Sequence, residues 1–533
     1  MLVVLPPTPV AEPSPTSEGA APCEGARFGR LAETLLRKHG WIAVRTGQLH
    51  DAAREFAIAS RGCELPEGAV GVAEGPLSRA MLDRHGITAR TSLATELAVF
   101  SADGTRLGRV VWPALDVRVI PATRGIVSEP YPFRSADPRW NADAFPFQEL
   151  TPTDRFRPAL YAQPIGPGES ERTGASVPIA LTDGERLLIG APLLELALAA
   201  AAFPPLDAGY WAHTRCGQTL GVEAWIADEI GAMVLRSGRS AVRVRRWPDG
   251  YDAALTIRHD YDRLIPAATR DALIATYAEL GARSSWGFLI DKAPRADAER
   301  LEAAGHEVML HSVAGSAERL KAEIDSLQAS TGCRALGSTS HGGLGAPGYL
   351  GGHHFGWAES CGFSYAELLG RPIGLPMPAI TLDKNGPRAL DVLLPSPHHS
   401  LDLNTKPEGH ALASLRESVP AALARGEHVV VMNHPDIHLA ELFELLRGLP
   451  RSRVWNTTYR DLVAWWRAAK YAARTSDASD AVQFGAALPE SVVIDWMSDR
   501  QTLSTIVPRG ARSASHPRSH ARATPTSIPI HAP

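Results

Sequence analysis

The segment Ala254–Asp262 joins a short apolar run to a cluster of ionisable groups. The apolar residues predict a β-strand, and one imidazole and two carboxylates, those of His259, Asp260 and Asp262, stand at its end. Because side chains alternate along an extended chain, Asp260 and Asp262 are expected on the same side of the strand. Two carboxylates that close repel each other unless a cation or a proton lies between them. The segment therefore predicts a metal site or an acid–base site, and a solvated strand end is the alternative.

Further strand-like segments downstream also end in imidazole groups. These groups are His311, His341 on a Gly-rich loop, His434 and His438. A lone histidine is often a structural residue, but such groups at the ends of several strands are harder to explain in that way. Carboxylate and imidazole ligands with an open position suit Zn²⁺ or a similar divalent ion. Such an ion acidifies a bound water and polarises a carbonyl, while a carboxylate takes a proton and a histidine protonates a leaving amine. The pattern predicts a metal-dependent hydrolase of amides or esters.

Strand-like and helix-like runs alternate over residues 250–472, which predicts a parallel sheet closed, or nearly closed, into a barrel. In such barrels the chemistry lies at the carboxyl ends of the strands. The predicted strands are 253–260, 284–290, 307–311, 334–340, 363–366, 390–394, 429–433 and 454–456. The predicted helices are 270–280, 293–304, 317–330, 352–361, 411–425, 439–446 and 459–472.

Three stretches of this region carry a family resemblance. Ile257–Asp262 stands where the polysaccharide deacetylase family, the NodB-homology domain of carbohydrate esterases, has Thr-Phe-Asp-Asp-Gly after an apolar strand. Gly305–Ser312, with the sequence GHEVMLHS, is similar to the first half of the family's second motif. Val454–Trp466 resembles the closing strand and helix. The resemblance implies a distorted (β/α)7-type barrel, a divalent metal such as zinc, and removal of acetyl groups from an N-acetylated sugar or glycan.

The resemblance also implies roles for individual residues, and two departures leave some of them open. The sequence Asp260-Tyr261-Asp262 replaces two adjacent aspartates, so the base and the ligand are not assigned by position. Gly315 and Ser316 stand where the second histidine of the second motif would fall, and His341 is the predicted substitute.

The predicted roles form three sets. Asp260 and His311 are expected to hold the ion, with Asp262 or His341 completing the set. Asp262 is the base, or Asp260 if Asp262 is a ligand, and His434 is the acid. The residues predicted to contact the substrate are His259, Ser312 and His438. The alternative function is a catalytically inactive, deacetylase-like protein that binds a glycan or serves as a scaffold.

The remaining chain divides by composition into three parts. Residues 1–26 are rich in Pro, Ala, Ser and Glu and are predicted to be disordered. Residues 27–245 are predicted to form a separate α/β domain of unknown role, with long irregular segments over 120–175. Residues 473–533 are predicted to form a mostly disordered basic tail, with one edge strand at 491–496.

Charge and cysteine content bound the class of protein. The 533 residues carry a formal net charge of -4, which does not favour a nucleic-acid partner. The five cysteines are scattered and form no CxxC pair, which fits a reducing compartment. The most apolar run, 189–203, is shorter than a bilayer span and contains Glu195. We therefore expect a cytoplasmic protein without a membrane span.

Overall fold

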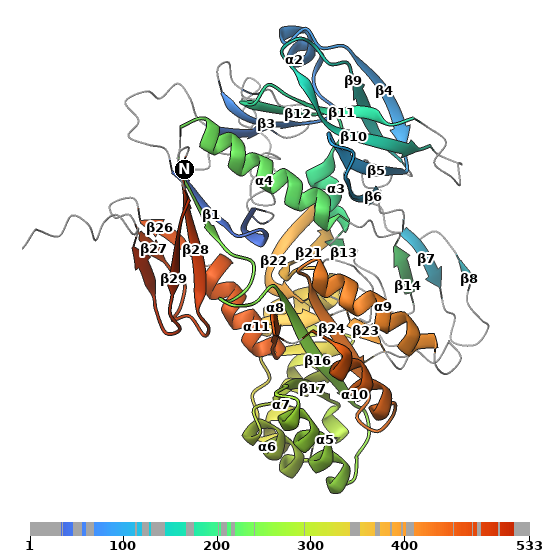
Figure 1. Cartoon of the computed structure of the whole chain (residues 1–533). Coiled ribbons are helices and arrows are strands. Elements are labelled where there is room, and N and C mark those ends of the chain that lie inside the picture. The colour runs from blue at the N-terminus through green and yellow to red at the C-terminus, as the bar shows by residue number, and fades with distance from the viewer. Residues whose placement is uncertain are drawn as a thin grey trace, which may run out of the picture.

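The computed structural model combines a strand-rich part with a curled sheet that is covered by helices (Figure 1). The predicted disorder of residues 1–26 lies outside the described residues. The structure describes residues 34, 36–45, 56–59, 65, 69–111, 115–119, 127–128, 144–166, 175–200, 202–203, 210–214, 219–238, 240–292, 294–341, 352–367, 374–383, 386–395, 398–400, 410–450, 452–471, 473–476, 481–498 and 502–515.

The largest sheet contains eleven strands and is mostly parallel. Its order is β13-β21-β22-β20-β19-β18-β17-β16-β24-β23, with β25 pairing β16. Only β21 and β22 pair antiparallel among these described strands. The strands are β13 (Ala202–Phe203), β16 (Ala253–Tyr261), β17 (Ser284–Phe288), β18 (Glu307–Ser312), β19 (Gly337–Ser340), β20 (Tyr365–Glu367), β21 (Met377–Asp383), β22 (Gly386–Leu394), β23 (His398–Ser400), β24 (His428–Asn433) and β25 (Val454–Asn456). All eight predicted strands are therefore confirmed to within a few residues, and β13, β21 and β23 are additional.

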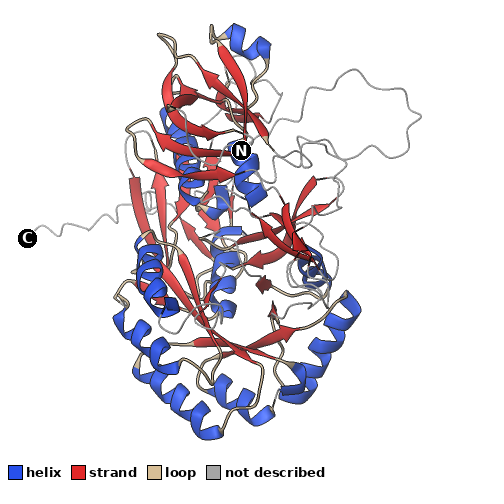
Figure 2. Ribbon diagram, turned by 90° about the vertical axis from the view of Figure 1, so that its right-hand side faces the viewer, coloured by secondary structure: helices blue, strands red, loops and turns tan. Residues whose placement is uncertain are grey.

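Helices follow most of these strands and lie along the outer side of the curled sheet (Figure 2). The helix α7 shows how local sequence sets their bounds, because Ser316 accepts a hydrogen bond from the Arg319 amide and Gly332 ends the helix at a φ of 78°. The helices are α5 (Ala267–Glu279), α6 (Arg295–Ala303), α7 (Ala317–Thr331), α8 (Gly352–Ser360), α9 (His410–Ala424), α10 (Leu439–Gly448) and α11 (Tyr459–Trp466), which continues as a π-helix over Arg467–Tyr471. The predicted helices are confirmed. Across the part of the chain that the structure describes, every helix is too short or too polar to cross a bilayer.

The strand β16 is buried along its whole length, and its two faces have different neighbours. Leu255 and Ile257 belong to the apolar core that the helices cover. Thr256 and Arg258 lie on the opposite, concave face, where they contact side chains of β24 and β20. Asp260 follows the same alternation. The concave face of the sheet is therefore lined by polar side chains near the carboxyl end of β16.

The strand-rich part contains a seven-stranded sheet with the order β2-β3-β12-β11-β10-β5-β6 and a pair β4-β9. The prediction of irregular segments over 120–175 is wrong for β9 and β10. The strand β10 pairs on both sides, and its Leu160 and Ala162 are fully buried. The elements are β2 (Phe56–Ala59), β3 (Val70–Glu74), α2 (Arg79–Arg84), β4 (Ala89–Ala94), β5 (Glu96–Ser101), β6 (Arg106–Val111), β7 (Leu115–Val119), β8 (Val127–Ser128), β9 (Phe145–Leu150), β10 (Arg157–Ile165), β11 (Val177–Thr182), β12 (Arg186–Ile189), α3 (Leu193–Ala200), β14 (Tyr210–Thr214) and α4 (Leu220–Arg236).

Parts of residues 27–245 pair directly with the C-terminal region. The strands β1 (Trp41–Arg45) and β15 (Ser240–Val244) share a sheet with β28 (Val492–Met497) and β29 (Thr502–Val507) in the order β1-β15-β28-β29. The strand β13 pairs with β21 of the large sheet. The structure is α/β, as predicted, but it does not confirm a separate N-terminal domain with a boundary near residue 245.

The described residues of 474–515 form strands where the sequence predicts a mostly disordered tail, and the strand predicted at 491–496 is present as β28, paired on both sides rather than at an edge. Besides β28 and β29, this segment forms a small sheet with the order β26-β27-β30. Val492 and Ile494 of β28 are fully buried in a core shared with α11. The composition does not reveal this packing, because it depends on contacts with the distant helix α11. The small sheet consists of β26 (Arg474–Ser476), β27 (Ala481–Gln483) and β30 (Ser513–Ser515).

Candidate metal centre

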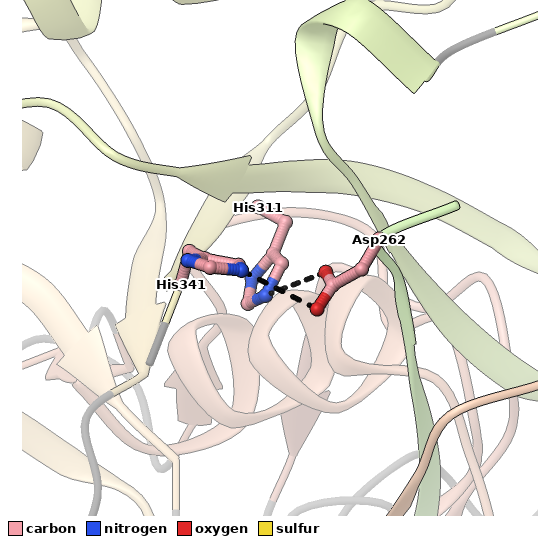
Figure 3. Close-up of side chains that lie close together, drawn as sticks. All are labelled: Asp262, His311 and His341. Atoms are coloured by element: carbon pink, nitrogen blue, oxygen red, sulfur yellow. Dashed lines mark ion pairs between the residues drawn. The ribbon is translucent and has the colours of Figure 1, made fainter. Parts of the chain in front are cut away.

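Asp262, His311 and His341 come together at the carboxyl ends of β16, β18 and β19, and both imidazoles point toward the carboxylate (Figure 3). One ligand atom from each side chain lies within 4.8 Å of the others. His311 Nε2 is 3.3 Å from Asp262 Oδ1, and His341 Nε2 is 3.3 Å from Asp262 Oδ2. The structure thus brings together three of the four residues predicted to bind a metal.

His311 is oriented by the neighbouring strand β19. Its Nδ1 lies 2.8 Å from Thr339 Oγ1, and the two residues are register partners in the parallel pair β18–β19. Burial lowers the pKa of His311 to about 4, so its ring is neutral at pH 7. When Nδ1 donates to Thr339, the Nε2 lone pair points toward two carboxylates. A cation in that space would relieve the repulsion and take the lone pair.

Asp262 supplies an ionised carboxylate, one oxygen of which accepts no hydrogen bond from the described residues. Burial alone would raise its pKa, but hydrogen bonds with His341 and His434 hold that pKa well below the usual range. Within the described residues, the buried Oδ1 of Asp262 has no hydrogen-bond partner. An ionised carboxylate and two imidazole nitrogens form a donor set that suits Zn²⁺ or a similar divalent ion. The residues present therefore fit a metal.

Asp260 lies beside this group and is held by a different partner. Its Oδ1 forms an ion pair with Arg258, and its Oδ2 lies 3.5 Å from His311 Nε2. Arg258 also pairs with Glu367 of β20, at 3.2 Å. Burial would raise the pKa of Asp260, but Arg258 and His311 lower it, so Asp260 is an anion at pH 7. One carboxylate oxygen is thus occupied by Arg258, and the other faces the histidines.

His434, which follows β24, contacts the group from a fourth strand. Its Nε2 lies 3.1 Å from Asp262 Oδ2. A second link joins the same two loops, because Arg263 forms an ion pair with Asp436 at 3.0 Å. His434 is therefore placed beside the carboxylate of Asp262, with its side chain partly exposed.

The three residues predicted to contact substrate are not part of the group formed by Asp262, His311 and His341, and their role stays a prediction. His259 is fully buried on the helix side of β16, where burial lowers its pKa to about 3. Ser312 is buried and donates a hydrogen bond to Glu323 of α7 at 2.7 Å. His259 follows Arg258, and Ser312 follows His311. Because side chains alternate along a strand, both residues lie on the face opposite to the concave interior. His438 has a φ of 51° at the start of α10, and its Nδ1 lies 3.8 Å from Glu441.

Three residues of the site were not predicted from the sequence. Arg258 and Thr339 each stand two positions before a predicted residue, so the same alternation could have identified them. Glu367 ends β20, and the rule that polar strand ends meet at one edge could have identified it. The sequence does not show which strands are neighbours in the sheet, and so it does not show that these three residues meet on the concave face.

The chain is similar to solved structures of deacetylases over a part of its length. No protein-family model matches the chain, and no curated protein matches it. A putative polysaccharide deacetylase from Mycobacterium smegmatis is 18% identical, with a TM-score of 0.32, and the match covers 41% of this chain and 91% of that chain. Puue allantoinase is 16% identical, with a TM-score of 0.33 and the same coverage. A probable polysaccharide deacetylase from Pseudomonas aeruginosa PAO1 is 14% identical, with a TM-score of 0.33, and again covers 41% and 91%.

Proposed function

We propose that this protein is a metal-dependent hydrolase that removes acetyl groups from an N-acetylated sugar or glycan. The observation that carries the proposal is the group Asp262, His311 and His341 with an ionised Asp260 beside it. The sequence resemblance over residues 251 to about 470 supplies the acetyl group and the sugar as the substrate class. The same resemblance assigns the curled sheet and its helices to a distorted (β/α)7-type barrel.

Asp262, His311 and His341 are the residues that would hold the divalent ion, with zinc as the expected metal. When bound, such an ion polarises the acyl carbonyl and makes a water molecule more acidic. Thr339 and the buried surroundings keep the His311 ring oriented and neutral, as a ligand must be. This arrangement supports Asp262 as a ligand in our proposal, a choice that the sequence leaves open.

Asp260 is then the general base. Its carboxylate is ionised because Arg258 stabilises the charge, and its Oδ2 faces the imidazole of His311. In this position it accepts a proton from the attacking water. Arg258 is itself held by Glu367, so the orientation of the base depends on a buried row of three charges.

His434 is the general acid. It lies on the other loop of the site, and its Nε2 contacts the Asp262 carboxylate at 3.1 Å. An imidazole at this place can carry a proton to the amine of the departing amino sugar. An O-acetyl ester needs less help of this kind, because an alcohol leaves more readily than an amine.

The test is acetate release from a panel of N-acetylated and O-acetylated glycans, with Zn²⁺ supplied and then removed by a chelator. We expect release that depends on the metal and is lost in Asp260→Asn. The matched control is His85→Gln, a histidine variant at the end of α2 in the strand-rich part, which should retain release. No release from any substrate by the metal-loaded wild-type protein would overturn the proposal.

One observation favours the alternative of an inactive glycan-binding or scaffold protein. Ser316, which stands where the second histidine of the family motif would fall, caps α7 and cannot serve as an imidazole ligand. His341 compensates for this loss in our proposal. Glycan binding without acetate release in the same panel would support the alternative.

A further inference from the structure

A buried chain of hydrogen bonds runs from α5 through β16 to the backbone of β24. Tyr277, His259 and Asn433 form this chain, and all three are fully buried. His259 Nε2 lies 2.6 Å from the Tyr277 hydroxyl, and His259 Nδ1 lies 3.0 Å from the carbonyl oxygen of Asn433. His259 and Asn433 are register partners in the parallel pair β16–β24. This chain of hydrogen bonds ends at Asn433, one residue before His434.

The direction of each hydrogen bond follows from the groups present. A backbone carbonyl can only accept, so Nδ1 of His259 donates to Asn433. With the proton on Nδ1 of the neutral ring, Nε2 accepts from the Tyr277 hydroxyl. Trp286 packs against the His259 ring with a centroid distance of 4.4 Å, which restricts the ring's rotation. The Asn433 carbonyl is therefore held by a donor that is itself fixed from two sides.

Asn433 makes a second hydrogen bond, this time through its side chain and within the loop that carries His434. The Asn433 Nδ2 group donates to the carbonyl of Ile437 at 2.7 Å, which bridges the loop from its first to its last residues. Tyr277 also packs edge-on against Phe443 of α10, the helix that follows the loop, at a centroid distance of 5.7 Å. The start of the loop is therefore held by His259, and the helix at its end packs against Tyr277, the hydrogen-bond partner of His259.

We propose that His259 is a positioning residue that fixes the loop of His434 through the Asn433 carbonyl. This inference rests on the proposed function, in which His434 is the general acid. Displacing a catalytic group by about 1 Å can lower the rate by about 100-fold. His259 therefore acts on turnover without contacting the metal ligands or the substrate.

The decisive comparison is between His259→Leu and His259→Asn. Leucine fills the space but donates no hydrogen bond, whereas the side-chain amide of asparagine can place an N–H near the position of Nδ1. We expect His259→Leu to lower kcat by about 10- to 100-fold with little change in KM or zinc affinity. His259→Asn should restore most of the lost kcat. Asn433→Ala, which removes the bridge to Ile437, should lower kcat in the same way.

Hydrogen exchange of the backbone amides of His434 and of residues 436–438 reports on the loop independently of activity. Exchange should be faster in His259→Leu and Asn433→Ala than in the wild type, and near wild type in His259→Asn. Unchanged exchange and kcat in His259→Leu, or a failure of asparagine to restore either, would overturn the inference. If the wild-type protein releases no acetate, the proposed function fails, and the exchange data still decide whether His259 fixes the loop.

Discussion

His341 Nε2 lies 3.3 Å from Asp262 Oδ2, so an imidazole that follows β19 reaches the carboxylate that follows β16. This hydrogen bond raises the pKa of His341 above its ordinary value. The contact brings His341 to within ligand distance of Asp262 and His311, where it can serve as the third donor of the candidate metal group. The candidate metal group therefore combines residues from the ends of three strands, and its second imidazole does not come from the segment after His311.

The two aspartates at the end of β16 should have separable roles. Asp260→Asn removes the proposed base but leaves the metal group intact, so we expect kcat to fall by about 100- to 10,000-fold with zinc affinity unchanged. Asp262→Asn should instead weaken zinc binding. Steady-state kinetics and zinc titration of both variants check this. Loss of zinc in Asp260→Asn with retention in Asp262→Asn would reverse the assignment.

The buried row formed by Asp260, Arg258 and Glu367 should matter for stability. Arg258→Met leaves two carboxylates buried near each other without their cation, so we expect a loss of about 3–5 kcal/mol in the free energy of unfolding. The matched control is Arg79→Met, which breaks an exposed ion pair with Asp83 and should cost under about 1 kcal/mol. Denaturant titration of both variants gives the comparison, and equal losses would contradict this account of the buried row.

The strand–helix order of residues 250–472 could be predicted because each unit carries its own local signal. An example is α7, which begins at the cap Ser316 and ends at Gly332. The strands β9 and β10 were not predicted, because residues 120–175 are rich in proline and arginine and their pairing depends on distant neighbours such as β5. The strand β28 was predicted at 491–496, but as an edge strand, because its pairing with β15 and its burial against α11 depend on distant parts of the chain.

Within the site, the alternation of side chains along the strand predicts that Asp260 and Asp262 share one side. The same rule also separates His259 from Arg258. His259 stands between two inward-facing positions and therefore faces the helices. The residue type alone made it look like a site residue. Arg258, which does face the site, was overlooked because arginine is not a metal ligand. Strand parity was thus more informative here than residue chemistry.

Two glycines test the packing beneath the site. A methyl group at Gly337 of β19 would lie 2.4 Å from the Tyr365 ring, whereas a methyl group at Gly356 of α8 would meet nothing within 4 Å. We expect Gly337→Ala to destabilise the protein by about 1–3 kcal/mol through overpacking. Gly356→Ala should stabilise it by about 0.5–1 kcal/mol, because alanine favours the helix. Thermal unfolding of the pair measures the difference, and a neutral Gly337→Ala would argue against this packing.

Buried neutral histidines should make the fold sensitive to acid. Burial lowers the pKa of both His306 and His354 to about 4 from an ordinary value of 6.5. Because their pKa is lower in the folded state, their contribution to stability is full above pH 6.5 and is lost as the pH falls toward 4. His306→Gln or His354→Gln should flatten the dependence of the unfolding temperature on pH across this window. An unchanged slope in both variants would exclude these two residues as its source.

The zinc content of the purified protein tests the central claim most directly. After exposure to Zn²⁺ and removal of free ion, we predict about one zinc per chain in the wild type and in the control His85→Gln, measured by elemental analysis. Asp262→Asn, His311→Gln and His341→Gln should each lose most of it. No bound zinc in the folded wild type, or full retention in all three variants, would contradict the metal centre.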